Sequence, residues 1–303
     1  MEKKLNILVT GGSGFLGSHI ADILSDNGHK VTIFDVKMSP FLRDDQEMIV
    51  GNLLDMADLE NAVKNKEVVF HLAGMADIDE CAKNPVAAAE HNVLGTVKLL
   101  EACIKHKVKR FMFASTAYVY SKAGYFYKSS KQACESFIEN YADLYGLKYT
   151  NLRYGSLYGG RSNSSNSIYK FIEQAIKESK ITYYGTGEEI REFIHVNDAA
   201  EITVECLSQE FENCHIMVTG VEKMRYKDLL VMIKEIFNDT IDIEILPSKR
   251  KAHYNITPYN FTPSIGQKIT KNKFIDMGEG ILRIIQNVHY QYQQEKENVK
   301  IGI

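Results

Sequence analysis

The sequence of 303 residues predicts an α/β fold, in which a doubly wound parallel sheet is joined to a smaller mixed α/β lobe. In the first half, short β-branched runs alternate with helix-length amphipathic stretches, as in a parallel sheet covered by helices on both faces. The composition then changes to Gly, Ser, Asn and Tyr across residues 153–167, as at a crossing between lobes. Beyond this crossing, short strands and helices are mixed.

The elements of the first half follow in strict alternation. Each helix returns the chain to a neighbouring parallel strand, so the carboxyl ends of the strands line one crevice. Strands are predicted at residues 5–9, 30–34, 68–71, 110–114 and 147–152, and helices at residues 15–27, 85–106 and 128–145.

The second half is less regular. Short strands are predicted near Ile181 and Glu192, and the polar tail 291–300 is expected to fray. Residues 1–152 are assigned to the sheet domain, which residues 195–218 rejoin; residues 153–194 and 219–303 form the substrate-binding lobe. Helices are predicted near residues 168–178, 198–207 and 226–237.

Charge and cysteine content narrow the class of protein. Lys and Arg number 36 against 39 Asp and Glu, a formal net charge of −3, which gives no basic surface for nucleic acid. No apolar run is long enough for a signal peptide or a membrane span. The five scattered cysteines form no C-x-x-C pair, which favours reduced thiols and a cytoplasmic protein with no metal site. Cys134 is interpreted as a packing residue.

A glycine-rich turn follows the first strand. Residues 10–17 read TGGSGFLG, which spaces Gly11, Gly14 and Gly17 three residues apart at the start of a helix. Glycine lets backbone N–H groups approach a pyrophosphate, and the helix amino end favours the anion. A plain tight turn is the alternative. In this strand–turn–helix context, the motif predicts a Rossmann-type dinucleotide site.

Asp35 follows the second strand, about twenty residues beyond the turn. A carboxylate there accepts hydrogen bonds from an adenosine ribose and repels a 2′-phosphate, so NAD is the predicted cofactor. Lys37 and Arg43 nearby leave NADP open.

Hydroxyl and amine groups gather at the predicted crevice. Tyr127 and Lys131 are four residues apart at the start of a helix and share one face, where an ammonium favours a phenolate suited to take a proton from an alcohol. Seen alone, this spacing also arises by chance. Ser115 and Thr116 end a buried strand, where a hydroxyl either caps the strand end or assists Tyr127.

Taken in order, these motifs resemble the extended short-chain dehydrogenase/reductases, and within them the NAD-dependent nucleotide-sugar epimerase/dehydratase family. The resemblance runs from residue 5 to about residue 207. It also rests on VFHLAG at residues 69–74, HNVLGT at 91–96, LRYGSLYG at 152–159 and REFIHVND at 191–198.

The resemblance implies roles for individual residues. Tyr127 is the base, Lys131 lowers its pKa and holds the nicotinamide ribose, and Thr116 is the catalytic hydroxyl residue that also contacts substrate. Asn92 supports the site, for which a structural role is equally open. The implied cofactor contacts are Gly11, Gly14, Phe15, Leu16, Gly17, Asp35, Asn52, Leu53, Leu72, Ala73, Gly74, Asn92, Ser115, Tyr127, Lys131 and Tyr154.

On the substrate side, Arg191 matches an arginine that clamps the nucleotide diphosphate, with an ion pair to Glu188 or Glu189 as the alternative. Ser156 stands where many relatives place a substrate-contacting asparagine. His195 belongs to a structural strand in the family and is not assigned catalysis.

Two further departures bear on the reaction. The strand end continues with alanine and tyrosine instead of the Asp-Glu pair of the 4,6-dehydratases, so dehydration is disfavoured. The segment 117–126 is also shorter than in many relatives, which opens the sugar site.

The implied activity is a nucleotide-sugar 4-epimerase, with a 4-dehydrogenase or ketoreductase as the alternative within enzymes. A non-catalytic NAD-binding protein is the alternative outside enzymes. The implied partners are a nucleotide-diphosphate sugar and a second copy of the chain, in a homodimer formed by helices 85–106 and 128–145.

Overall fold

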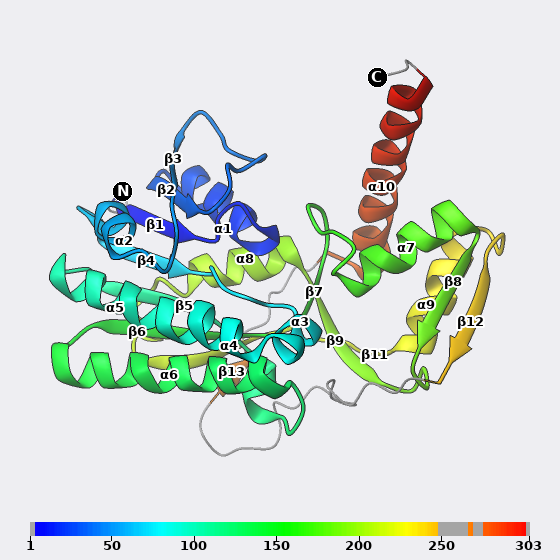
Figure 1. Ribbon diagram of the computed structural model, residues 1–303. Coiled ribbons are helices and arrows are strands. Elements are labelled where there is room, and N and C mark those ends of the chain that lie inside the picture. Colours follow the sequence, from blue (N-terminus) through cyan, green and yellow to red (C-terminus); the bar gives the residue numbers. More distant parts are fainter. Residues whose placement is uncertain (1–3, 248–265, 269–274, 301–303) are drawn as a thin grey trace.

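A computed structural model describes residues 4–247, 266–268 and 275–300. Within these ranges, the large sheet is entirely parallel and has the order β13-β10-β6-β5-β4-β1-β2-β3 (Figure 1). The strand order reverses between β1 and β4, where ligands of such sheets bind. The strands are β1 (Asn6–Thr10), β2 (Lys30–Asp35), β3 (Gln46–Val50), β4 (Val68–His71), β5 (Arg110–Thr116), β6 (Lys148–Tyr154), β10 (Cys214–Val218) and β13 (Gly266–Lys268).

Helices cover both faces of the large sheet because successive strand residues point to opposite sides. On one face, Ile7 and Val9 pack in one core with α1 (Phe15–Asp26) and α8 (Val196–Glu205). On the other face, Leu8 packs in a second core with three further helices. These are α2 (Met56–Val63), α5 (Gly95–Lys105) and α6 (Tyr125–Tyr145).

The smaller lobe has its own core and lies beyond the carboxyl ends of the sheet strands (Figure 1). One sheet has the order β11-β9-β7, and β8 and β12 pair in parallel in another. The strands are β7 (Ser156–Tyr158), β8 (Lys180–Tyr184), β9 (Ile190–His195), β11 (Lys223–Arg225) and β12 (Asp242–Leu246). The helices are α7 (Ser167–Glu178), α9 (Tyr226–Ile236) and α10 (Met277–Lys300). None of the helices in the described ranges is long and apolar enough to cross a membrane.

The helix expected at residues 85–106 is interrupted. The structure has α4 (Pro85–Ala88), a π-helical turn (Ala89–Leu94) and then α5, preceded by the short α3 (Ile78–Lys83). A π-turn holds one more residue than an α-turn, and apolar periodicity does not reveal it. Short 3₁₀ turns occupy Ala117–Tyr120 and Gln209–Phe211.

Two expectations at the end of the chain differ from the structure. The tail 291–300 is helical and continues α10, whose first half is anchored by the buried Ile281, Ile284 and Val288. The sequence predicted that residues 219–303 belong to the smaller lobe. Within this range, however, β13 pairs with β10 in the large sheet. This strand reads Gly-Gln-Lys and carries no apolar signal. Residues 248–265, 269–274 and 301–303 of that range lie outside the described residues.

Candidate active site

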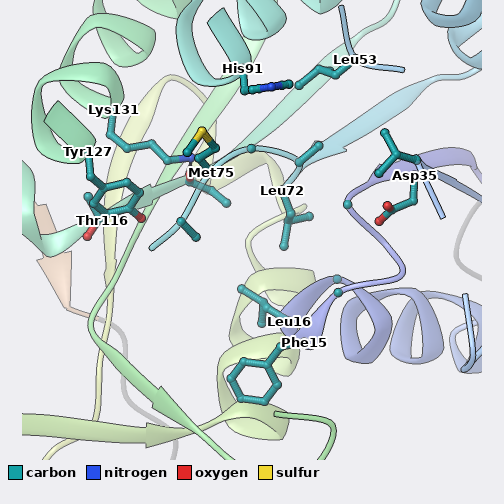
Figure 2. A pocket seen from close by; sticks show the side chains of 18 of the residues that line it. Phe15, Leu16, Asp35, Leu53, Leu72, Met75, His91, Thr116, Tyr127 and Lys131 are labelled. Atoms are coloured by element: carbon teal, nitrogen blue, oxygen red, sulfur yellow. Dashed lines mark hydrogen bonds between the residues drawn. The ribbon is translucent and has the colours of Figure 1, made fainter. Parts of the chain in front are cut away.

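A cavity of about 720 Å³ opens at the carboxyl ends of β1, β2, β4 and β5 (Figure 2). Thr116, Tyr127 and Lys131 lie at one end of it and Asp35 at the other. Asn92, Ser156 and Arg191 are not among the residues that line it. The other predicted residues that line it are Gly11, Gly14, Phe15, Leu16, Gly17, Asn52, Leu53, Leu72, Ala73, Gly74, Ser115 and Tyr154.

The glycine turn packs too closely for side chains. Gly11 has φ +71°, and a Cβ there would lie 2.6 Å from the backbone nitrogen of Ala73. A Cβ on Gly17 would lie 2.3 Å from the carbonyl oxygen of Gly11. Gly14 is the N-cap of α1, and no side chain in the described part of the chain caps this helix. The first-turn N–H groups are therefore left for an anion, which fits the pyrophosphate of NAD.

Asp35 is held at the cavity wall by the turn itself. Its carboxylate accepts hydrogen bonds from the N–H of Ser13 at 3.1 Å and of Lys37 at 3.3 Å. The Arg43 guanidinium, considered above as a binder of a 2′-phosphate, pairs instead with Asp26 at 2.7 Å and Asp45 at 2.9 Å. The carboxylate of Asp35 thus lines the cavity, where it can accept from ribose hydroxyls, while the Arg43 guanidinium is engaged by two other carboxylates.

A buried histidine supports the wall formed by residues 72–75. His71 bonds to the hydroxyls of Thr10 at 2.7 Å and Thr96 at 2.9 Å. Burial lowers the pKa of His71 to about 3, so the ring stays neutral. Thr96 donates to the carbonyl of Asn92 at 2.5 Å, which leaves the histidine Nε2–H to donate to Thr96.

Asn92 lies behind this wall. Its Oδ1 accepts from the N–H of Met75 at 2.7 Å, while its Nδ2 donates to the Met75 carbonyl at 3.0 Å and to Ser130 at 2.9 Å. Its amide is engaged with protein groups and joins the cavity wall to α6. These contacts are those of a residue with a structural role, which is one of the two roles expected for Asn92.

Lys131 joins α6 to the end of β5. Its Nζ donates to the carbonyl of Ala114 at 2.8 Å and lies 4.7 Å from the centre of the Phe113 ring. Burial lowers the pKa of Lys131. Tyr127 lies one turn earlier in α6, with its ring edge-on to Tyr118 at 6.4 Å. A cation and a phenol therefore enter the cavity from one helix.

Other predicted side chains are engaged within the fold. The Ser115 hydroxyl donates to Glu135, and the Tyr154 hydroxyl bonds to Thr203 at 2.6 Å. Thr116 also lines the cavity, but its hydroxyl has a different kind of partner, because Oγ1 accepts from the backbone N–H of Tyr118 at 3.2 Å. At the strand end, Thr116 therefore presents a hydroxyl to the cavity, and Ser115 directs its own toward α6.

Ser156 and Arg191, the other two predicted substrate residues besides Thr116, do not line the cavity. Arg191 is buried in β9, where it donates to the Ile190 carbonyl at 2.9 Å and its guanidinium lies 5.4 Å from the Tyr226 ring centre. Ser156 is in β7, between two residues that do line the cavity. His195 caps α8 by accepting from Asn197 at 3.3 Å, and burial lowers its pKa to about 4.

Sequence reasoning missed several lining residues. Some are immediate neighbours of predicted ones, as Val36 follows Asp35. Others lie on the segment from α3 to the π-turn and recur at helical intervals of four, three and four, although this segment is not one continuous helix. These are Glu80, Asn84, Ala87 and His91; the remaining missed residues are Phe34, Gly51, Met75, Ala76, Ala114, Gly155 and Leu157.

Comparison with known proteins identifies the family. The model of the NAD dependent epimerase/dehydratase family matches residues 7–220. The chain belongs to this family. It is therefore an enzyme that uses NAD, as the resemblance of its motifs implied.

Individual relatives within the family have different activities. The chain is 31% identical to a putative UDP-glucose 4-epimerase of Methanocaldococcus jannaschii, over 92% of this chain and 97% of the relative. It is 28% identical to a UDP-N-acetyl-α-D-glucosaminuronate decarboxylase of Bacillus cytotoxicus, over 89% and 91%. The structure of a UDP-glucose 4-epimerase of Thermotoga maritima with UDP-glucose superimposes with a TM-score of 0.84 and 26% identity, covering 95% and 100%.

Proposed function

We propose that the protein is an NAD-dependent 4-epimerase of a UDP-sugar. The observation that carries the proposal is the single cavity that contains the glycine turn and Asp35 at one end and Thr116, Tyr127 and Lys131 at the other. The sheet domain then binds the cofactor and the smaller lobe covers the nucleotide sugar. The epimerases among the relatives support the choice of UDP-sugars as substrates.

Tyr127, Thr116 and Lys131 have separate roles in the oxidation of the sugar alcohol. The phenolate of Tyr127 takes the proton of the 4-hydroxyl while Thr116 hydrogen-bonds the same oxygen. Lys131 keeps a positive charge beside the phenolate. Bound NAD supplies the acceptor for the hydride that leaves carbon 4. After the keto sugar has rotated in the cavity, Tyr127 returns the proton to the oxygen at carbon 4.

The carboxylates argue against dehydration. Among the described residues that line the cavity, Asp35 and Glu80 are the carboxylates, and the strand end beside Thr116 continues as Ala117 and Tyr118. Elimination of water from a 4-keto sugar removes the proton of carbon 5 and the hydroxyl of carbon 6, which needs a base and an acid beside these carbons, and the strand end supplies no carboxylate for either task.

Product analysis tests this proposal. The purified protein is incubated with UDP-glucose, UDP-galactose, UDP-N-acetylglucosamine, UDP-N-acetylgalactosamine and UDP-glucuronate, and the products are identified by NMR. We expect a 4-epimer with no net NADH. A stable keto product with accumulating NADH would replace the epimerase by a 4-dehydrogenase, and loss of carbon dioxide from UDP-glucuronate would replace it by a decarboxylase.

Replacing Asp35 with Asn is expected to weaken NAD binding about tenfold, because an amide oxygen accepts more weakly than a carboxylate from the ribose hydroxyls. The preference for NAD over NADP is expected to become smaller, because the neutral amide does not repel a 2′-phosphate. Asn keeps the acceptor oxygen that binds Ser13. Calorimetry with both nucleotides measures the change. The exposed Asp44, in the loop after β2, provides the control Asp44→Asn. An unchanged preference would contradict the role of Asp35.

We also propose a homodimer through α5 and α6. Exposed apolar side chains on α6 support it, namely Phe137, Leu144 and Tyr145. Phe137→Glu is expected to yield a monomer in sedimentation velocity at micromolar concentration, while Leu282→Glu, on α10, leaves the dimer intact. A monomeric wild-type protein would refute the proposal.

A further inference from the structure

A buried ion pair lies beneath the strand end that carries Thr116. Glu135, one turn after Lys131 on α6, is 5% exposed, and Arg153, on β6, is 6% exposed. Arg153 donates through Nε to Oε1 at 3.0 Å and through Nη2 to Oε2 at 2.6 Å. The pair is therefore bidentate and joins helix to sheet.

Each residue of the pair also binds a residue close to Thr116 in the chain, one before it and one after it. The Ser115 hydroxyl, directly before Thr116, donates to Glu135. The Tyr120 hydroxyl, at the end of the 3₁₀ turn after Thr116, accepts from Arg153 Nη1, and the guanidinium lies 4.6 Å from the centre of that ring. Ser115 and Arg153 are direct neighbours in the β5–β6 register.

The same helix carries the other catalytic groups. Tyr127, Lys131 and Glu135 follow at intervals of four residues and lie along one face of α6. This face is joined to β5 at two points, through Lys131 to the Ala114 carbonyl and through Glu135 to the Ser115 hydroxyl. Lys131 and Glu135 therefore link Tyr127, on α6, to Thr116, at the end of β5, and Arg153 holds Glu135 from β6.

Stability alone does not account for such a pair. Desolvating two charges costs about as much as their attraction returns, and apolar replacements of equal volume are often as stable. A fully bonded buried pair does fix a single arrangement of the groups that it joins.

We propose that Glu135 and Arg153 are positioning residues, which hold the Thr116 hydroxyl at the distance from Tyr127 that proton transfer needs by anchoring Ser115 before it and Tyr120 after it. The inference rests on the proposed function, because it assigns these residues to the same reaction. In this chain only ten residues separate Thr116 from Tyr127, so the pair acts on a short connection.

The sharpest test removes one oxygen atom. Tyr120→Phe deletes the hydroxyl bound by Arg153 and keeps the ring. We expect kcat to fall about tenfold, with KM, NAD content and Tm nearly unchanged. Tyr184→Phe, at an exposed tyrosine of β8, is the matched control and is expected to retain the wild-type kcat. Ser115→Ala tests the other anchor, and Ser115→Thr, which restores a hydroxyl, is expected to recover kcat.

A double-mutant cycle separates positioning from general stability. In a Thr116→Val background, Tyr120→Phe is expected to cause no further loss of kcat, because the group that it positions is gone. Equal losses in both backgrounds, or an unchanged kcat in both Tyr120→Phe and Ser115→Ala, would overturn the inference.

Crystal structures give a readout that does not need turnover. In NAD-bound Tyr120→Phe, the Thr116 Oγ1 to Tyr127 hydroxyl distance is expected to lengthen relative to the wild type. An unchanged distance would refute positioning. A wild-type protein that turns over no nucleotide sugar would refute the proposed function, and this structural comparison would still decide the inference.

Discussion

Tyr127→Phe is expected to lower turnover of the UDP-sugar by about 10³-fold while NAD stays bound. The substitution removes only the phenolic oxygen, which takes and returns the proton of the 4-hydroxyl. Acid–base groups of this kind contribute about 10²–10⁴-fold. The ring that packs edge-on to Tyr118 remains, so the first turn of α6 keeps its packing. Product formation by NMR under saturating substrate gives the rate, and the nucleotide released on denaturation gives the NAD content.

Tyr290→Phe is the matched control for this substitution, because Tyr290 is an exposed tyrosine of α10 that does not line the cavity. It is expected to turn over like the wild type. Wild-type turnover by Tyr127→Phe would remove the tyrosine from the mechanism, whatever the fold.

Lys131→Met is expected to reduce turnover at neutral pH by about 100-fold and to shift the rising limb of the pH–rate profile to higher pH. The methionine has a similar length and no charge. An ammonium close to a phenol favours the phenolate, so without Lys131 the proton of Tyr127 is expected to be lost only at higher pH. Part of the activity is therefore expected to return in alkaline solution, toward the ordinary phenol pKa of about 10.

The pH profile distinguishes this effect from a packing defect. Lys131 is buried and donates to the Ala114 carbonyl, so its loss also removes a hydrogen bond and weakens the hold on the cofactor. Those losses lower the rate at every pH, whereas the electrostatic effect is recovered as the pH rises. Lys170→Met, at an exposed lysine of α7, is the control. A profile that falls without shifting would contradict the electrostatic role of Lys131.

Much of the large sheet could be predicted because its strands are apolar on both faces. Strand β4 begins and ends where the sequence places it, since all its residues are buried. The short polar strand β13 has no such pattern, and its place depends on pairing with β10, far away in the chain. Strand β3 was missed for a similar reason, because most of its residues are partly exposed.

The candidate site could be predicted as a set of positions but not as a set of side-chain directions. The motifs brought Asp35, Thr116, Tyr127 and Lys131 to one cavity, because Asp35 and Thr116 end parallel strands and the helix that carries Tyr127 and Lys131 follows the second of these strands. They did not show that Ser115 donates to Glu135 or that Tyr154 bonds to Thr203. Those partners come from elements that meet only in the folded protein.

The π-helical turn Ala89–Leu94 makes this part of the chain intolerant of a change in length. Deleting one residue from it would allow Pro85 to Lys105 to wind as one α-helix. Every residue before the deletion would then rotate by about 100° relative to α5. The faces of Asn84 and Ala87 would leave the cavity together, and the amide of Asn92 would lose its register with Met75. Deleting one residue here would therefore rotate one part of the segment relative to the other, and only the insertion of a residue within the same turn would restore the arrangement.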